Sequence, residues 1–563
     1  MEQPPTEYFY PAQQPGVYGM PPPPVPGYMA PPIIMGPGIM YPPPGQFYPQ
    51  GAPPMEPVPM TSSDGISDNP DNYIPDVIKA FIPFFHAQVI EKNVDEILRI
   101  YEEEFGKLST RFFTEAPWPR AELIAPLVKG DEMFLALYKE MQFRHIYAKF
   151  KPTVEQRMES FQNYINLFNI ILGSKEPVDL EIPNQWLWDI IDEFIYQFQS
   201  YVMFRGKLKS RSSEEIQLLK DNPKVWSVHG VLNVLYALVD KSNINKQLEA
   251  YYAGEEPSSV AGDLGNLSLY KNLGYFSLIG LLRLHTQLGD YYQALQAVAN
   301  VQLSKKVLAT TRVPASQISL YYYVGFCFLM MRRYKDTLRT FSNIIVFIQR
   351  AKNHFQPKSY QQLQVIKQNE QMLNIIAMVV ALNPQHVDEV VNSQLRGDKF
   401  AEKIMSLSKG ELKTFEEMFF FACPKFMSPI PPDYESLPEN YNKQPTEHQC
   451  DVFKAEIEQQ LVLPKLRSYL KFYTTMPISK LSAFMEVDEA TLQEHLLCFK
   501  HKTRCLVSTS KGTQHLAGEV QSISDLDFYI DGEMLHIADT KMARRYGDFF
   551  IRQIHKLEEI CSK

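Results

Sequence analysis

Helical periodicity dominates this chain from residue 72 to residue 461. In long windows, apolar residues recur at intervals of three and four, the spacing that places them on one face of an α-helix. Few runs of the alternating β-type precede residue 500. Helices with one apolar face bury that face by packing on one another, so the pattern predicts a mostly α fold. The segments predicted to be helical are 132–150, 154–172, 184–204, 225–239, 267–288 and 448–461.

Residues 72–265 form a predicted N-terminal helical region. The first segment, 74–105, has the pattern of one or two amphipathic helices. We expect a break near Pro83, because proline lacks a backbone donor and its ring clashes with the preceding turn. Polar or Gly- and Pro-rich stretches separate the later helices, which suggests antiparallel pairs stacked in series.

An internal repeat supports this stacking in residues 266–460. The segment LGDYYQAL at 288–295 recurs loosely as MRRYKDTL at 331–338. Each copy lies between two predicted helices and combines a tight turn with an aromatic residue, which is typical of the elbow in a tetratricopeptide-like (TPR-like) hairpin. The offset of 43 residues exceeds the usual period of about 34. The sequence therefore predicts an irregular TPR-like helical-repeat solenoid, in which each pair packs on its neighbours.

Residues 464–540 have a different pattern, which predicts a winged helix. Two short helical patterns precede a third helix expected at 489–502. β-type runs follow at 505–508 and 527–536, and the second run contains the hairpin turn signal Asp531-Gly532. Such a module would cap the end of the helical repeats. The residues expected on the apolar face of its third helix are Leu492, Leu496, Leu497 and Phe499.

Charge indicates that this module docks on protein rather than on nucleic acid. Residues 464–563 hold 14 Lys and Arg against 13 Asp and Glu, whereas a nucleic-acid module should be clearly basic. Groove-reading helices present their N-terminal part, but here that part carries Glu489 and Glu494, which phosphates would repel. We interpret the basic far end as a solvated helix end that complements the macrodipole, with weak RNA contact as the alternative. The residues at that end are Lys500, Lys502 and Arg504.

A last amphipathic helix is predicted at residues 541–563. Its apolar stripe lies beyond the domain on which it would have to pack, and burying such side chains is worth roughly 1.5–3 kcal/mol each. We therefore expect the helix to dock into a helical bundle built with other chains. The expected docking residues are Tyr546, Phe550, Ile554 and Leu557.

Residues 1–71 form a predicted disordered tail. The first 60 residues hold 20 of the 42 prolines, and the first Lys or Arg is Lys79. Proline fixes φ and removes backbone donors, so such a segment favours extended, solvated conformers that bury little. The preferred interpretation is a disordered extension that has no role of its own. The alternatives are a ligand for a proline-binding module and a low-complexity segment that associates with other molecules.

Composition limits where this protein is expected to work. A formal net charge of -8 argues against strong overall attraction to nucleic acid or to an anionic membrane. The six cysteines are scattered without a CxxC pair and no signal peptide precedes them, so reduced thiols in the cytosol are expected. The longest apolar run, 321–331, is shorter than the roughly 18 residues that a membrane span needs. The sequence predicts a cytoplasmic protein that does not cross a membrane.

No catalytic constellation is recognisable in the sequence. HExxH, the GxxxxGK[ST] phosphate loop, the GxSxG elbow and glycine-rich dinucleotide turns are absent. Carboxylates are frequent, but Asp189, Asp192 and Glu193 lie in an amphipathic helix, and we interpret them as its polar face. The chain is therefore predicted not to be an enzyme and to have no catalytic residues.

One window invites a zinc interpretation. It contains His495, Cys498, His501 and Cys505. A single helix normally offers zinc two ligands, with the others returning from a knuckle or hairpin, whereas three of these residues lie on one predicted helix. Buried thiols and solvated imidazoles are the preferred interpretation. We predict no metal and no cofactor.

Two winged-helix segments carry a resemblance to a known family. They are YLKFYTTMPISKLSAFMEV and DFYIDGEMLHIAD, and they follow the helical-repeat array. The combination resembles the PCI domain, a module shared by the proteasome lid, the signalosome and translation initiation factor 3. The resemblance implies a PCI domain at 331–537, with its winged helix at 464–540 and a bundle helix at 541–563.

Further segments resemble, more specifically, a PCI subunit of eukaryotic translation initiation factor 3. They extend over residues 184–555 and include NQWLWDIIDEFIYQFQSY, SLYKNLGYFSLIGLLRLH and HIADTKMARRYGDFFIRQIHK. This resemblance implies a non-catalytic scaffold subunit in a hetero-oligomer, with other factor 3 subunits as partners and subunit K as a direct neighbour. It also implies a complex that binds the small ribosomal subunit and promotes recruitment of initiator tRNA and mRNA.

Two alternatives remain open at this point. One is a scaffold subunit of another PCI complex, the proteasome lid or the signalosome. The other is a winged-helix protein that binds nucleic acid directly, which would show strongly salt-dependent affinity.

Overall fold

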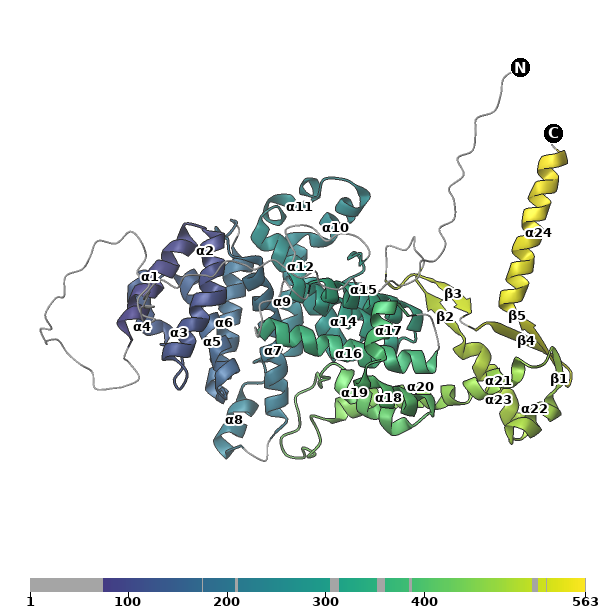
Figure 1. Cartoon of the computed structure of the whole chain (residues 1–563). Helices are drawn as coiled ribbons and strands as arrows, with labels where there is room; N and C mark the ends of the chain where they lie inside the picture. Colours follow the sequence, from purple (N-terminus) through teal and green to yellow (C-terminus); the bar gives the residue numbers. More distant parts are fainter. Residues whose placement is uncertain are drawn as a thin grey trace, which may run out of the picture. The chain divides into compact units, whose positions relative to one another are not determined.

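The computed structural model describes residues 74–174, 176–207, 211–303, 313–351, 360–383, 387–508, 515–522 and 524–561. All of them belong to the second of two compact units, which are residues 1–67 and 68–563. The tail predicted at 1–71 lies outside the described residues. The described chain is mostly helical, as the periodicity predicts (Figure 1).

Helices fill the chain ahead of the winged helix. The first are α1 (Asp76–Ile90), α2 (Val94–Arg99), the π-helix η2 (Ile100–Glu104), α3 (Phe105–Phe112), α4 (Ala121–Ile124), the 3-10 helix η3 (Ala125–Val128), α5 (Glu132–Lys149), α6 (Val154–Gly173), α7 (Asn184–Arg205), α8 (Ser213–Asp221), α9 (Val228–Ser242), α10 (Ile244–Ala253) and α11 (Ser258–Gly265). The next are α12 (Ser268–Gln287), α13 (Tyr291–Ala297), α14 (Pro314–Met330), α15 (Tyr334–Ala351), α16 (Tyr360–Leu382), α17 (Glu389–Leu395), α18 (Asp398–Ser408), α19 (Leu412–Ala422) and α20 (Gln444–Leu461). The six segments predicted from periodicity are α5, α6, α7, α9, α12 and α20, with ends that differ by at most four residues.

The break expected near Pro83 is absent, and that prediction is wrong. Helix α1 continues through Pro83 and ends at Ile90. Buried side chains on both sides of the proline hold the helix: Phe81 lies 6.3 Å from Trp118, and Phe85 stacks on Trp186 at 5.8 Å between ring centroids. This packing outweighs the one backbone hydrogen bond that proline removes.

The two copies of the repeat adopt the same elbow, which confirms the repeat. In the first elbow, Gly289 has φ +85° and the amide of Asp290 donates to the carbonyl of His285 at 2.9 Å. In the second elbow, Arg332 has φ +61° and the amide of Arg333 donates to the carbonyl of Phe328 at 2.8 Å. A left-handed residue with this backbone bond ends one helix and lets the next begin at once.

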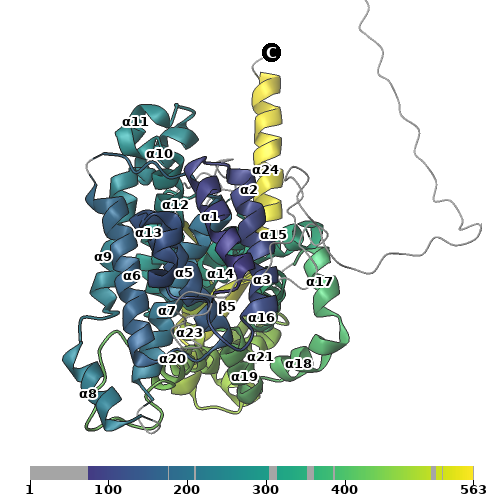
Figure 2. The same cartoon turned by 90° about the vertical axis from the view of Figure 1, so that its left-hand side faces the viewer.

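Helix α12 is the centre of the helical part. It packs on α7, α9, α13 and α14 (Figures 1 and 2). Its side chains are buried along nearly its whole length. The approach to α9 depends on Gly274, because a Cβ atom there would collide with the Oγ of Ser242. One hydrophobic core continues from Ile74 to Ile457 without a break.

The winged helix has a second core of its own. It consists of α21 (Leu463–Leu470), β1 (Thr475–Pro477), α22 (Ile478–Met485), α23 (Glu489–Lys502), β4 (Leu526–Asp531) and β5 (Met534–Asp539), with antiparallel strands in the order β1-β5-β4. The predicted hairpin turn is confirmed, and Gly532 has φ +57° there. Leu492, Leu496 and Phe499 are buried as predicted, whereas Leu497 is 59% exposed, which corrects its assignment to the apolar face.

The β-type run at 505–508 does not join this sheet. It forms β2 (Arg504–Val507), which pairs with β3 (Glu519–Ser522) in a separate two-stranded sheet. The pair is held on the second elbow of the repeats, where the Nη1 of Arg333 donates to the carbonyl of His515 at 2.5 Å. The carboxylate of Asp336 accepts the amide of Ser508 at 3.0 Å. The β2–β3 pair thereby attaches the winged helix to the repeats.

The Pro-rich break between α19 and α20, residues 423–443, is described throughout without helix or strand, and we call it the strap. The strap contacts helices that come earlier in the sequence. The amide of Met427 donates to the carbonyl of Gln287 at 3.1 Å, and the Nδ2 of Asn442 donates to the carbonyl of Met203 at 2.9 Å. The strap is thus fastened to the ends of α12 and α7.

Candidate docking surfaces

The last helix, α24 (Thr540–Cys561), carries the most extensive run of exposed apolar side chains on any one described helix. It follows β5 directly and contacts β4 and β5. Three of the residues expected to dock are exposed: Phe550 by 60%, Ile554 by 52% and Leu557 by 60%. The side chain of the fourth, Tyr546, lies outside the described residues.

The apolar face of α24 is wider than the stripe of four residues predicted from the sequence. At 3.6 residues per turn its exposed apolar residues span about 200° of the helix circumference. The residues that widen it are Phe549, Ile551 and Ile560, which are 51%, 55% and 68% exposed. A two-helix seam needs a narrower stripe, so this face suits contact with more than one helix. Plotting the sequence around a helical wheel could have found these residues, because their spacing also fits an amphipathic helix.

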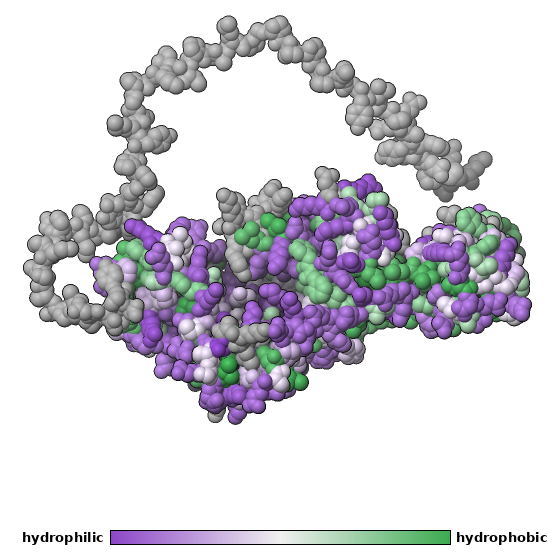
Figure 3. Space-filling model, turned by 90° about the horizontal axis from the view of Figure 1, so that it is seen from below, coloured by the Kyte–Doolittle hydropathy of each residue, from purple (hydrophilic) through white to green (hydrophobic). Residues whose placement is uncertain are grey.

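Hydrophobic surface elsewhere is more scattered. On the face shown in Figure 3, hydrophilic side chains predominate, and hydrophobic side chains form several patches among them. Scattered exposed apolar residues are normal on a protein surface, whereas a contiguous stripe marks an interaction site.

The basic group at the end of α23 is largely occupied within the chain. Lys502, 11% exposed, forms an ion pair with Glu456 of α20. The Nζ of Lys500 lies 3.2 Å from the Oδ1 of Asp527 and also stands over the ring of Phe528. Arg504 begins β2 and is exposed. These contacts leave little unpaired positive charge for a phosphate backbone, and RNA contact by the three residues stays a prediction.

The His and Cys window does not gather into a cluster in the structure. Cys505 is buried in β2, and the Sγ of Cys498 points to the carbonyl of Gln459 at 3.6 Å. Across the described ranges, no three His, Cys, Asp or Glu side chains are placed so that they could hold a metal ion. Within the same part of the chain, no helix is long and apolar enough to cross a membrane.

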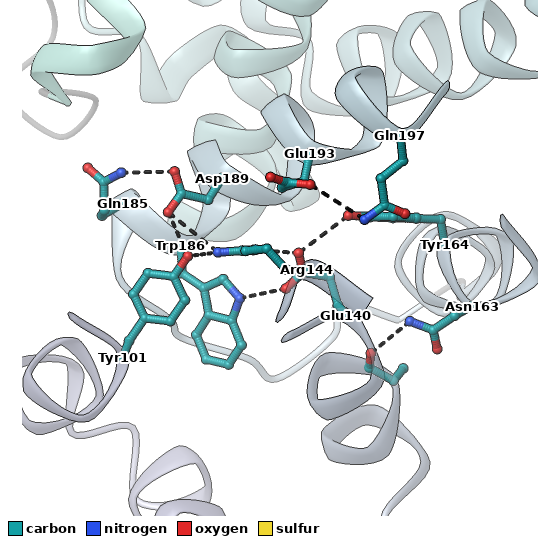
Figure 4. A network of polar contacts seen from close by, with 11 residues as sticks. Tyr101, Glu140, Arg144, Asn163, Tyr164, Gln185, Trp186, Asp189, Glu193 and Gln197 are labelled. Carbon is teal, nitrogen blue, oxygen red and sulfur yellow. Dashed lines mark hydrogen bonds and ion pairs between the residues drawn. The ribbon is translucent and has the colours of Figure 1, made fainter. Parts of the chain in front are cut away.

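A buried acidic network joins η2, α5, α6 and α7 (Figure 4). At its centre is Glu140, whose side chain is fully buried. One oxygen of Glu140 accepts a hydrogen bond from the Nε1–H of Trp186 at 3.1 Å. The other accepts a hydrogen bond from the hydroxyl of Tyr164 at 3.3 Å and forms an ion pair with Arg144. The Nη1 of Arg144 also lies 3.6 Å from the Oδ2 of Asp189. With its oxygens occupied, Glu140 serves to tie helices together.

Two carboxylates of α7 complete this network. Asp189 accepts the hydroxyl of Tyr101 at 2.6 Å, and Glu193 accepts the Nε2–H of Gln197 at 3.5 Å. They lie on the polar face that the sequence predicts for α7, and both are partly exposed. The structure adds that Asp189 contacts residues of η2 and α5 there.

Burial has a clear effect on proton binding in the network. Desolvation raises the pKa of Asp189 and of Glu193 to about 7, although the nearby Arg144 opposes the shift. Desolvation also raises the pKa of Glu140 well above its usual value. Aspartate and glutamate in an unfolded chain titrate near pH 4, so between about pH 4 and 7 the folded protein binds more protons than the unfolded one.

Stability is therefore expected to fall as the pH rises from about 4 to about 7. The contribution of these carboxyls is present in full below the unfolded pKa and is lost as the pH passes the folded pKa. Glu193→Gln keeps a neutral side chain at every pH. We expect the advantage of the variant over the parent to be about 1–2 kcal/mol larger at pH 8 than at pH 5, because most of the parent's loss falls between those pH values. Thermal melting at the two pH values measures this, and a variant that is equally affected at both would contradict it.

Comparison with known proteins identifies the family to which this chain belongs. A family model described as RNA polymerase I-associated factor PAF67 matches residues 156–557. Stacked helix pairs, a winged helix with its own core and an exposed amphipathic helix define the chain as a PCI-type subunit. Eukaryotic translation initiation factor 3 subunit L of Nematostella vectensis is 57% identical over 488 residues, which are 87% of this chain and 92% of that protein. The same subunit from Danio rerio and from Homo sapiens is 53% identical over 509 residues, 86% of this chain and 88% and 90% of theirs. The chain belongs to the eukaryotic translation initiation factor 3 subunit L family.

Proposed function

We propose that this protein is a non-catalytic scaffold subunit that enters initiation factor 3 through α24 and its PCI domain. The observation that carries the proposal is the wide, exposed apolar face of α24. Exposing about 200° of apolar helix surface to water is unfavourable. Burial of that surface in a bundle stabilises the helix by several kcal/mol. The remaining factor 3 subunits are the natural source of the other helices in that bundle.

The direct neighbour expected from the resemblance is subunit K. A PCI subunit beside another PCI subunit would place two winged helices and two terminal helices together, which supports a shared helical bundle. The assembly would be a cytoplasmic hetero-oligomer, and its contacts would be between proteins.

The complex that contains this subunit is proposed to bind the small ribosomal subunit and to promote recruitment of initiator tRNA and mRNA. Within it, this chain would reach the ribosome through its partners. The near-neutral winged helix supports that role, as do the internal ion pairs of Lys500 and Lys502. Direct RNA contact would be weak.

The test is sedimentation of a tagged copy from mildly crosslinked lysate through a sucrose gradient, followed by mass spectrometry of what co-purifies. We expect co-migration with the small ribosomal subunit together with the other factor 3 subunits, and crosslinks to subunit K. Migration with proteasome lid or signalosome subunits would keep the fold and overturn the function.

The salt dependence of RNA binding distinguishes the alternative, a protein that binds nucleic acid directly, from this proposal. If the purified protein bound RNA with an affinity that fell by several orders of magnitude between low and moderate salt, several phosphates would be neutralised. In that case Arg504→Gln would lower the salt slope by about one. Our proposal expects neither effect.

A further inference from the structure

The apolar face of α24 is exposed to water in the free chain. Its side chains are 51–68% exposed, and they are Phe549, Phe550, Ile551, Ile554, Leu557 and Ile560. Contact of such a face with water is unfavourable in proportion to its area. Before other subunits bind, this face needs a different cover. A second copy of the chain is the one protein that is present in every preparation at the same concentration.

A glycine within this face permits close approach of another helix. Gly547 is exposed and lies seven residues before Ile554, on the same side of α24. Glycine in the middle of a helix destabilises the helix relative to alanine. A Cβ atom added to Gly547 would meet no atom within 4 Å, so packing within the described chain does not require glycine there. A second helix would benefit from it, because the two backbones can come closer together.

One edge of the apolar face is complementary to itself when it is turned round. Arg544, Ile551 and Glu558 follow one another at intervals of seven residues and therefore share one side of the helix. If two copies of α24 run in opposite directions with Ile551 beside Ile551, Arg544 of each copy faces Glu558 of the other. A parallel order would place like charges opposite each other, which is unfavourable. The carboxylate of Glu558 is 68% exposed and thus accessible to a second copy.

The opposite edge of the face does not oppose this order. It contains Met542, Phe549 and Lys556, again at intervals of seven residues. Lys556 carries its only charge, and in an antiparallel pair the lysines of the two copies lie at opposite ends. The antiparallel order also brings the positive end of each helix dipole to the negative end of the other. Both edges and the dipoles therefore favour the same arrangement.

We propose that the free protein associates with a second copy of itself through an antiparallel pair of α24 helices, and that this pair is exchanged for other subunits on assembly. The inference rests on the proposed docking role of α24, because the same face serves both contacts. A pair of helices buries a narrower stripe than the arc of about 200°, so part of the face stays exposed in the pair. A bundle that covers the whole arc is favoured over the pair, which permits the exchange.

The first measurement is sedimentation velocity of the purified full chain over a concentration series from roughly 0.5 to 50 µM. We expect the average mass to rise with concentration from that of one chain toward that of two. Ile554→Asp combined with Leu557→Asp should remain a monomer throughout the series. A parent chain that is a monomer at every concentration would overturn the proposal, and so would an Ile554 and Leu557 variant that associates as the parent does.

Charge reversal tests the order of the two helices. Glu558→Arg should weaken association roughly 10-fold, because it replaces two attractive contacts by two repulsive ones. Arg544→Glu should have a similar effect, and the chain that carries both changes should associate as the parent does. Glu255→Arg is the matched control, because it makes the same change of charge at an exposed residue of the helical part. It should leave association unchanged.

Mixing the two single variants gives a second readout that does not depend on the double variant. Arg544→Glu and Glu558→Arg chains complement each other at both contacts, so mixed pairs should form at concentrations where each variant alone is a monomer. A parallel pair would not show this preference. Absence of mixed pairs, together with no recovery in the double variant, would overturn the antiparallel order and the proposal with it.

Two differently tagged copies test the exchange. They should co-purify from the free protein but not from the fraction that contains the other factor 3 subunits. Co-purification from that fraction would overturn the exchange. Failure of self-association alone leaves the proposed function standing, since capture of the other subunits is measured separately. Loss of that capture would instead overturn the proposed function, whatever the free chain does.

Discussion

Replacing Ile554 and Leu557 by aspartate is expected to release this protein from its complex while the chain itself stays folded. The two side chains are 52% and 60% exposed on α24, so the isolated chain loses little packing when they change. In a bundle each would contribute roughly 1.5–3 kcal/mol by burial, and their joint loss corresponds to at least a ~100-fold weaker association. Co-purification of the other subunits measures the release, and circular dichroism with thermal melting measures the fold.

The matched control for this variant changes the other side of the same helix. His555→Asp combined with Lys556→Asp also adds negative charge to α24, but both residues lie outside the apolar arc. We expect this control to keep its partners. If it releases them equally, charge rather than burial would explain the result. If the Ile554 and Leu557 variant unfolds as a monomer, α24 is needed by its own chain and the docking proposal fails.

Arg144→Met is expected to be the most damaging single change in the helical part. Arg144 is the cation between Glu140 and Asp189, and it lowers the pKa of Asp189 and of Glu193 against desolvation. Removing one partner from a buried ionic network leaves uncompensated charge and costs about 3–5 kcal/mol. The loss should be larger at pH 8 than at pH 5, because the carboxyls take up protons at the lower pH. Denaturant titrations at both pH values measure it.

Two controls separate charge from packing in this experiment. Lys139→Met lies on the same helix and breaks an exposed ion pair with Glu122, so a loss of less than about 1 kcal/mol is expected. Adding Glu140→Gln to Arg144→Met removes a carboxylate together with its cation and should recover part of the lost stability. An equal loss at pH 5 and pH 8, without recovery in the double variant, would assign the effect of Arg144 to packing alone.

Local signals in the sequence suffice for several single elements, whereas no range is predicted for others such as α8, α10 and α17. The elbows at Gly289 and Arg332 were predicted from a turn and an aromatic residue alone, because the contacts that end one helix and start the next lie within a few residues. The hairpin at Gly532 was found for the same reason. The stripe on α24 follows from 3.6-residue periodicity, which also identified Phe550, Ile554 and Leu557 as neighbours.

Errors occurred where distant segments decide the outcome. The continuity of α1 through Pro83 depends on Trp118 and Trp186, which are far away in the sequence. The strand β2 was predicted, but its pairing with β3 in a separate sheet was not, since strand pairing is a property of two segments. Periodicity places Asp189 on the polar face of α7, yet it contains no information on which helix will cover that face.

The sequence by itself determined the mostly helical fold, the winged helix and the amphipathic last helix, because hydrophobic spacing and turn residues act over a few positions. Only the tertiary structure decided which of these faces find a partner within the chain. It pairs Lys502 with Glu456, encloses Glu140 among three helices and buries Arg205 beneath the strap, whereas the apolar face of α24 stays exposed. The reason is physical: burial and charge pairing depend on what packs against a residue, and that neighbour is usually distant in the sequence.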